Sequence, residues 1–119
     1  MKLVDTHTHL YEEQFDTDRN EMIQRAIDAG VATMLIPNVD TTTVKDMMEL
    51  VRQHPNHIFP MMGLHPCYVK PDTYIKELAL VYEYLQKQKF VAVGEIGIDM
   101  HWDKSTLEIQ KEAFHQQCD

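Results

Sequence analysis

Short apolar segments alternate along this chain with segments of helical periodicity, and this alternation limits the possible folds more than any other feature. The apolar segments are rich in Val, Ile and Phe and lie at residues 2–6, 31–36, 58–62 and 90–93. They recur about every 30 residues, which is the length of one strand, one helix and two loops. Strands that alternate with helices pair in parallel through right-handed crossovers. The sequence therefore predicts an α/β fold of four consecutive βα units.

The predicted helices follow these strands and have recognisable ends. Candidate N-terminal caps occur at residues 16–18, at residues 41–43, at Asp72 and near Ser105. Gly30 and Pro55 are the expected stops of the first two helices. No glycine, proline or cap precedes the C-terminal Asp119, so the chain is expected to stop inside its fourth helix.

Length and composition favour one small globular unit. At 119 residues with 44% hydrophobic composition, the chain can bury one modest core, so we expect a single domain over residues 1–119. The longest apolar runs are far shorter than the roughly 20 residues that cross a bilayer. Asp5 and His7 also stand where a signal peptide would need its apolar stretch. These features predict a soluble, cytoplasmic protein that makes no membrane contact.

Two histidines stand at alternate positions near the end of the first predicted strand. Asp5, His7 and His9 are two residues apart, so they would share one face of an extended strand. The two imidazoles could then clamp a divalent ion through neutral ring nitrogens, with Asp5 accepting a hydrogen bond from one ring. A His-x-His pair alone also fits solvated or hydrogen-bonded histidines. The acid on the same face and a third candidate ligand on another strand favour the metal site.

That third candidate follows the fourth predicted strand. Glu95 comes directly after an apolar run without any other charge, where burial of a carboxylate is unfavourable unless it is paired or bound to a metal. Gly94 and Gly97 would remove side-chain bulk beside it. The alternative for Glu95 is a structural acid paired with a lysine. Asp99, in the loop that follows, could equally be a turn or capping residue.

Four motifs, in this order, resemble the TatD family of metal-dependent deoxyribonucleases. They are DTHTHL at residues 5–10, the cluster Phe15, Asp16 and Asp18, GLHP at residues 63–66 and GEIGID at residues 94–99. The resemblance covers the whole chain, and the combination of DxHxH with GEIGxD is highly specific. It implies a TIM-type (β/α)8 barrel of about 250 residues, with the metal site at the C-terminal ends of the strands. Four βα units would be the first half of such a barrel, truncated within the fourth helix.

The resemblance also implies roles for individual residues. His7 and His9 would bind one divalent metal ion, and Glu95, as ligand and catalytic residue, would bridge to a second ion. His65 would contact a phosphate in the pocket, and Asp99 would lie around the metals or face the substrate. The ions would be Mg²⁺, Mn²⁺ or Zn²⁺. The family's further histidines and aspartate on later strands are absent here, so a missing C-terminal half or a second chain would complete the barrel.

These implications predict metal-assisted hydrolysis of phosphodiester bonds at DNA ends. The net charge of -8 leaves no basic face for a long duplex, so bound metal would supply the positive charge, which favours single strands or strand ends. Trp102 could stack on a base or simply pack, and Met100 stands where relatives often carry a tyrosine.

Two alternatives stay open. The first is another metal-dependent barrel hydrolase, acting on an amide, a lactone or a phosphomonoester. The second is an inactive fragment or assembly partner, because three ligands can hold an ion loosely without completing a two-metal site.

Overall fold

The computed structural model describes residues 1–119 and contains one four-stranded parallel sheet in the order β1-β2-β3-β4. The strands are β1 (Leu3–Asp5), β2 (Val31–Pro37), β3 (Ile58–Met62) and β4 (Ala92–Val93). All three neighbouring pairs are parallel, as predicted. The central strand β3 is mostly buried and β2 is buried or half-buried, whereas β1 and β4 form the exposed edges and are shorter than predicted.

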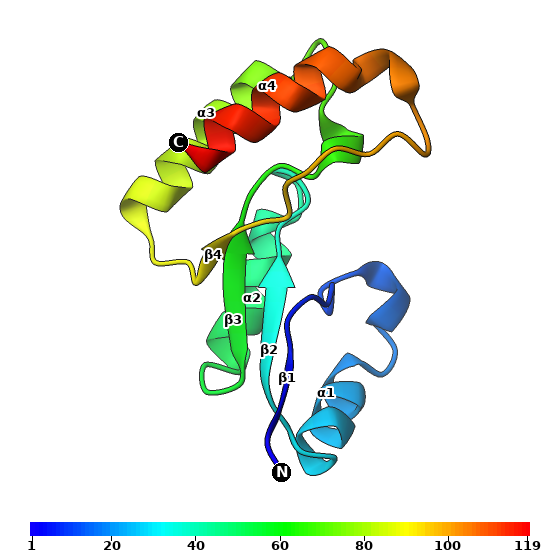
Figure 1. Ribbon diagram of the computed structural model, residues 1–119. Coiled ribbons are helices and arrows are strands. Elements are labelled where there is room, and N and C mark those ends of the chain that lie inside the picture. Colours follow the sequence, from blue (N-terminus) through cyan, green and yellow to red (C-terminus); the bar gives the residue numbers. More distant parts are fainter.

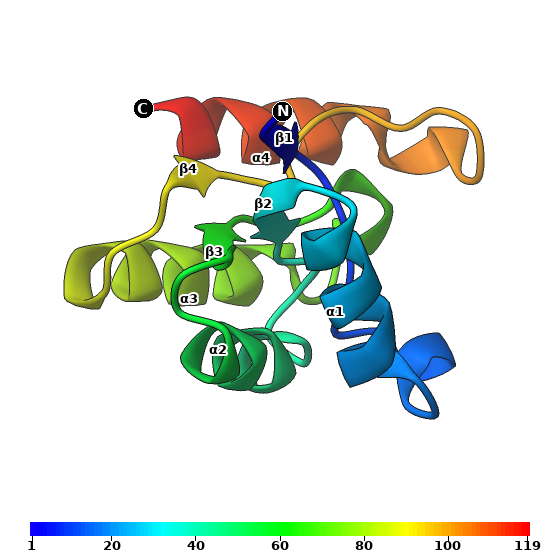
Figure 2. The same cartoon turned by 90° about the horizontal axis from the view of Figure 1, so that it is seen from below.

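Each strand is followed by a helix. The helices are α1 (Arg19–Asp28), α2 (Val44–Gln53), α3 (Tyr74–Lys87) and α4 (Leu107–Cys118), with the short 3-10 helices η1 (Glu13–Phe15), η2 (Pro66–Tyr68) and η3 (Lys104–Thr106). Helices α1, α2 and α3 lie on the same side of the sheet (Figure 2). Helix α4 packs against α3 beyond the carboxyl ends of the strands (Figure 1). The chain is therefore built of four consecutive βα units.

The predicted helix caps are only partly right. The N-cap positions of α1, α2 and α3 are occupied by Asp18, Thr43 and Thr73, and none of these side chains makes a cap hydrogen bond. Asp72, the predicted cap of the third helix, lies one residue before that position. Gly30 follows α1 as predicted and has a φ of 97°, which side chains other than glycine rarely adopt.

The core lies between the sheet and helices α1 to α3. Ile36, Ile58 and Met62 of the strands are fully buried, and Ile23 of α1 and Met47 of α2 pack against them. In α2 the buried residues recur every three positions, which gives the helix one apolar stripe toward the sheet. This packing fixes the sheet, and with it the edge where the strands end.

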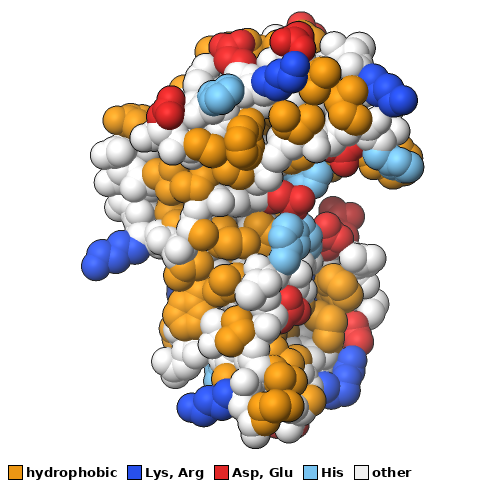
Figure 3. Space-filling model, in the orientation of Figure 1, with side chains coloured by type: hydrophobic (Ala, Val, Ile, Leu, Met, Phe, Trp, Pro, Cys, Tyr) orange, Lys and Arg blue, Asp and Glu red, His pale blue; other side chains and the backbone are white.

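The edges of the sheet expose apolar side chains, as expected for part of a barrel. Leu3 and Val4 in β1, and Val91 and Val93 at β4, are among the exposed large hydrophobic residues. Apolar side chains are spread over the face that Figure 3 shows. No helix in the structure combines the length and apolarity that a membrane crossing requires.

Candidate metal centre

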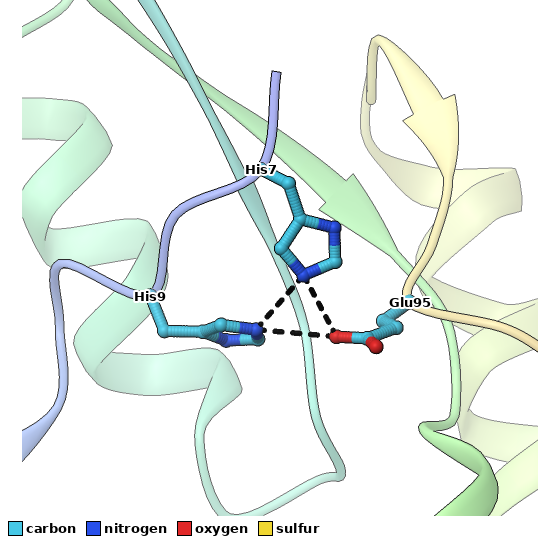
Figure 4. Close-up of side chains that lie close together, drawn as sticks. All are labelled: His7, His9 and Glu95. Carbon is cyan, nitrogen blue, oxygen red and sulfur yellow. Dashed lines mark hydrogen bonds and ion pairs between the residues drawn. The ribbon is translucent and has the colours of Figure 1, made fainter. Parts of the chain in front are cut away.

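His7 and His9 lie just beyond β1 rather than on it, because the strand ends at Asp5. The segment nevertheless continues to pair with the next strand, since the backbone N–H of Thr8 donates to the carbonyl of Leu35 at 3.1 Å. This extended backbone turns the two alternate rings to the same side (Figure 4). The predicted strand was too long, but the predicted common direction of the rings is right.

Glu95 is held in place by the ends of its neighbouring strands. Its backbone N–H donates to the carbonyl of Asn38 at 3.1 Å, and the N–H of Gly94 donates to the carbonyl of Met62 at 3.0 Å. The close approach depends on Gly63, because a Cβ there would lie 2.8 Å from the carbonyl carbon of Gly94 and 3.0 Å from the carbonyl oxygen of Glu95. A glycine at the end of β3 therefore brings β4 and Glu95 close.

The predicted roles of Gly94 and Gly97 in making room for Glu95 are wrong. A Cβ on Gly94 would meet only the side chain of Met61, at 3.7 Å, which is an ordinary contact. A Cβ on Gly97 would meet nothing within 4 Å, although this residue has a φ of 153°. Gly63 is the residue whose missing side chain matters.

Asn38 connects three strand ends and was not predicted. Its side chain is fully buried; the amide donates to the carbonyl of Gly63 at 3.0 Å and the amide oxygen accepts from the hydroxyl of Thr43 at 2.8 Å. Its backbone pairs with Met61 and Glu95. The only signal in the sequence is a polar residue directly after an apolar strand, where the buried polar groups of the sheet edge need partners.

Three possible ligand atoms converge at the carboxyl edge of the sheet. The Oε2 atom of Glu95 lies 3.0 Å from Nε2 of His7 and 3.1 Å from Nε2 of His9, and the two nitrogens are 3.2 Å apart (Figure 4). Ligands bound at about 2.0–2.1 Å are separated by about 3.0 Å around an octahedral ion and by about 3.4 Å around a tetrahedral one. The observed separations fit both geometries. The set of two imidazoles and one carboxylate can therefore accept a divalent cation.

His65 faces the other oxygen of the same carboxylate. Its Nε2 lies 3.2 Å from Oε1 of Glu95, and its Nδ1 accepts a hydrogen bond from the backbone N–H of Cys67 at 3.1 Å. Because Nδ1 accepts, the ring must carry a proton on Nε2, which makes this atom a donor. His65 thus supplies a hydrogen-bond donor beside the three converging atoms.

Asp5 and Asp99 are not brought into this cluster. The prediction that Asp5 orients a histidine ring is wrong, because its Oδ1 accepts from the backbone N–H of His7 at 3.1 Å. Asp99 accepts from the backbone N–H of His101 at 2.8 Å. This bond holds the pKa of the Asp99 carboxyl below its usual range, so the group is anionic at neutral pH. Asp99 thus lies in the loop after β4, and its carboxylate bonds to the backbone of that loop.

Two glutamines of α4 hold loops at this edge of the sheet, and neither was predicted. Gln110, almost fully buried, accepts from the N–H of Asp99 at 2.7 Å and donates to its carbonyl at 3.0 Å. Gln117 accepts from the N–H of Leu64 at 2.7 Å. Their positions, three residues before and four after the buried Ala113, place both on its side of the helix. This helical spacing is the only feature of the sequence that could have indicated their role.

The loop after His9 is held by one arginine. The guanidinium of Arg19 donates to three consecutive carbonyls, those of Leu10 at 2.8 Å, Tyr11 at 3.2 Å and Glu12 at 2.8 Å. Such charge-assisted bonds are stronger than those between neutral groups. Arg19 therefore fixes the backbone of residues 10–12, directly after His9.

Replacing Arg19 with methionine is expected to lower the free energy of unfolding by about 1.5–3 kcal/mol, because charge-assisted hydrogen bonds are lost and carbonyls lose their partner. Urea titration measures this change. The matched control is Arg25→Met, since Arg25 is exposed and makes one ion pair with Asp18; it should change stability by less than about 0.5 kcal/mol. Equal effects of the two substitutions would show that Arg19 does not anchor the loop.

Tyr11, in the same loop, contacts the ring of His9. The hydroxyl of Tyr11 lies 2.9 Å from Nδ1 of His9 and donates to the carbonyl of Pro37 at 2.6 Å. Tyr11 is buried, and nothing in its sequence context distinguishes it from a core residue.

On the surface, histidine and acidic side chains gather at the indentation between the upper helices and the lower half of the molecule (Figure 3).

Consecutive parallel βα units with polar side chains converging at the carboxyl ends of the strands define a class of fold, the TIM-type barrel, which carries its functional sites at that end. Within this class the chain belongs to the TatD family, because the family model for TatD related DNase matches residues 4–119. The family predicted from the four motifs is thereby confirmed.

Individual relatives agree with this assignment. The chain is 40% identical over 115 residues to an uncharacterized metal-dependent hydrolase, YabD, of Bacillus subtilis, covering 97% of this chain and 44% of that protein. It is 31% identical over 115 residues to the 3'-5' ssDNA/RNA exonuclease TatD of Erwinia tasmaniensis, with the same two coverages. Both sequences extend well beyond the part that this chain matches.

A solved structure supports the fold. The crystal structure of YjjV, a TatD homolog from Escherichia coli, matches with a TM-score of 0.79 at 29% identity, covering 97% of this chain and 44% of that one. The predicted fold class, parallel βα units that form the first half of a TIM-type barrel, is confirmed. The chain spans less than half the length of the relatives it matches.

Proposed function

We propose that this chain carries the first part of the metal centre of a divalent-metal-dependent hydrolase, as a single partial domain over residues 1–119. One observation carries the proposal: three ligand atoms from two distant segments, on His7, His9 and Glu95, lie within 3.2 Å of one another. An exposed acid near a histidine is common, but Glu95 is partly buried, with 23% of its side chain exposed, and its Oε2 faces both rings. This arrangement favours a cation between them.

The role of the metal follows from general chemistry. A bound divalent ion lowers the pKa of a coordinated water and stabilises charge on the oxygens of a phosphoryl group. The chain's own residues would hold and orient it: His7 and His9 through Nε2, and Glu95 through Oε2. We propose two ions, Mg²⁺, Mn²⁺ or Zn²⁺, with Oε1 of Glu95 as the oxygen available to the second; in the present arrangement Oε1 lies 3.2 Å from Nε2 of His65.

The proposed substrate is an end of a DNA strand. The net charge of -8 disfavours a protein that grips a long duplex through its own basic surface. Trp102, in the loop after β4, is 79% exposed, so it is free to stack on a base. The relative named as a 3'-5' ssDNA/RNA exonuclease also favours single strands.

Two further residues complete the proposed site. His65, whose Nε2 is a donor, would move from Glu95 to a phosphate oxygen of the substrate. Asp99 would order the loop that carries Trp102, because it accepts from the backbone immediately before this residue. The rest of the barrel would come from a C-terminal half or from a second chain, and it would supply the remaining ligands.

The test uses the protein at its natural length, stripped of metal with a chelator and reloaded with Mg²⁺, Mn²⁺ or Zn²⁺. Single-stranded DNA labelled at either end, duplex DNA, RNA and a panel of small phosphomonoesters, amides and lactones are compared as substrates. We expect chelator-sensitive release of nucleotides from ends of single-stranded DNA, and its loss in His7→Ala but not in the surface variant His115→Ala.

Other outcomes would point elsewhere. Activity confined to the small substrates would replace the nuclease by another barrel hydrolase. Failure to bind any of the three ions, together with inactivity on every substrate, would leave only the inactive fragment or assembly partner.

A further inference from the structure

The buried Tyr11 lies between the metal centre and the end of β2. Its hydroxyl oxygen is 2.9 Å from Nδ1 of His9 and 2.6 Å from the carbonyl oxygen of Pro37. Its ring meets the His9 ring edge-on, with centroids 5.8 Å apart, and only 6% of the residue is exposed. The contact therefore joins the loop after β1 to the carboxyl end of β2 without intervening solvent.

The direction of these two hydrogen bonds is determined. A backbone carbonyl only accepts, so Tyr11 must donate its single hydroxyl proton to Pro37. The hydroxyl oxygen can then only accept from His9. The proton of a neutral His9 ring therefore lies on Nδ1.

This protonation state determines what His9 presents to the metal centre. With its proton on Nδ1, a neutral His9 carries a lone pair on Nε2, and this atom lies 3.1 Å from Oε2 of Glu95. Two acceptors at this distance repel each other unless a cation or a proton lies between them. The opposite tautomer would place N–H on Nε2, which could donate to Glu95 but could not bind a metal.

We propose that Tyr11 is a positioning residue of the metal centre: its hydroxyl holds His9 in the Nδ1-protonated form and fixes the ring so that Nε2 points at the cation. The inference rests on the proposed function, because it assigns His9 as a metal ligand. Asp5, the residue expected from sequence to orient a ring, bonds instead to the backbone of His7. Tyr11 thus takes the role that the sequence suggested for an acid.

The experiment compares wild type with Tyr11→Phe in the protein at its natural length. Phenylalanine keeps the buried ring and removes only the hydroxyl. Calorimetric titration with Mn²⁺ and Zn²⁺ should show affinity about 10–100-fold weaker, the usual effect of losing a partner that orients a ligand. NMR of ¹⁵N-labelled histidine in the metal-free protein should show His9 protonated on Nδ1 in wild type and as a mixture of tautomers in the variant.

The matched control is Tyr84→Phe, which removes a hydroxyl from another tyrosine that packs against the core away from the site. It should leave both the His9 spectrum and the metal affinity unchanged. Urea titration of both variants shows whether a weaker affinity merely reflects partial unfolding.

The possible outcomes separate the inference from the proposed function. If wild type binds metal and Tyr11→Phe binds it equally well, the role of Tyr11 is refuted while the metal centre stands. An unchanged His9 tautomer in the variant would refute it as well. If wild type binds no metal, the proposed function fails, and the role of Tyr11 toward a cation fails with it. The NMR spectrum of His9 then still shows whether the Tyr11 hydroxyl determines the tautomer of this ring.

Discussion

Glu95→Gln is expected to weaken divalent metal binding by more than about 100-fold, beyond the 10–100-fold loss that follows removal of a merely orienting partner. Glu95 is the only anion among the three converging groups, and its Oε2 atom faces both histidine rings. Glutamine has nearly the same shape but no charge, so the ion would lose the only anionic ligand of the three. Calorimetric titration measures the affinity, and the proposed hydrolysis of DNA by the protein at its natural length should fall in parallel.

In the metal-free protein, Glu95→Gln should change the free energy of unfolding by only about 1 kcal/mol, because glutamine preserves the shape of the side chain. A suitable control is Glu77→Gln in α3. The carboxylate of Glu77 also accepts two hydrogen bonds, from the N–H and hydroxyl of Thr41 at 2.9 and 2.7 Å, but it takes no part in the cluster of possible ligands. Equal metal affinities of wild type and Glu95→Gln would exclude Glu95 as a ligand.

Much of the fold could be predicted because each βα unit is encoded locally. Apolar runs of strand length, apolar stripes of helical period and turn residues between them place β2, β3 and α1 to α3 within a few residues. The edge strands are shorter than predicted because pairing, not composition, decides where a strand ends. β1 pairs only with β2, and β4 only with β3, so the unpaired side of each edge lacks the bonds that would extend it.

The candidate site was predictable where parallel topology determines direction. His7, His9 and Glu95 were expected at one edge of the sheet, since the carboxyl ends of parallel strands lie together, and the structure brings them within hydrogen-bond distance. Their role as metal ligands stays a prediction.

The supporting residues could not be predicted in the same way. Asn38 and Tyr11 act through partners far along the chain, at Gly63 and at Pro37, and a single asparagine or tyrosine is common in loops. The closeness of Gly63 to Glu95 appears only when β3 and β4 are placed side by side.

Gly63→Ala is expected to reduce both stability and metal affinity. The added Cβ would lie 2.8 Å from the carbonyl carbon of Gly94, closer than real Cβ contacts, and 3.0 Å from the carbonyl oxygen of Glu95, which is a tight contact. Both atoms belong to the backbone, so relief requires that the segment carrying Glu95 move away from β3. We expect the free energy of unfolding to fall by about 3 kcal/mol, the upper end of the usual range for overpacking.

In Gly63→Ala, the loss of metal affinity should follow from the movement of the segment that carries Glu95. The backbone N–H of Glu95 is bound to Asn38, and movement away from β3 would stretch this bond and shift the carboxylate away from His7 and His9. Metal affinity, measured at a urea concentration where the variant is still folded, should fall by about 10-fold or more, as for other losses of ligand orientation.

Gly94→Ala is the matched control, because its Cβ would meet only Met61 at 3.7 Å. If Gly94→Ala proves as harmful as Gly63→Ala, the close approach at residue 63 does not position Glu95. If Gly63→Ala lowers both stability and affinity, while Glu95→Gln lowers chiefly the affinity, the backbone and the carboxylate act as separate parts of one site.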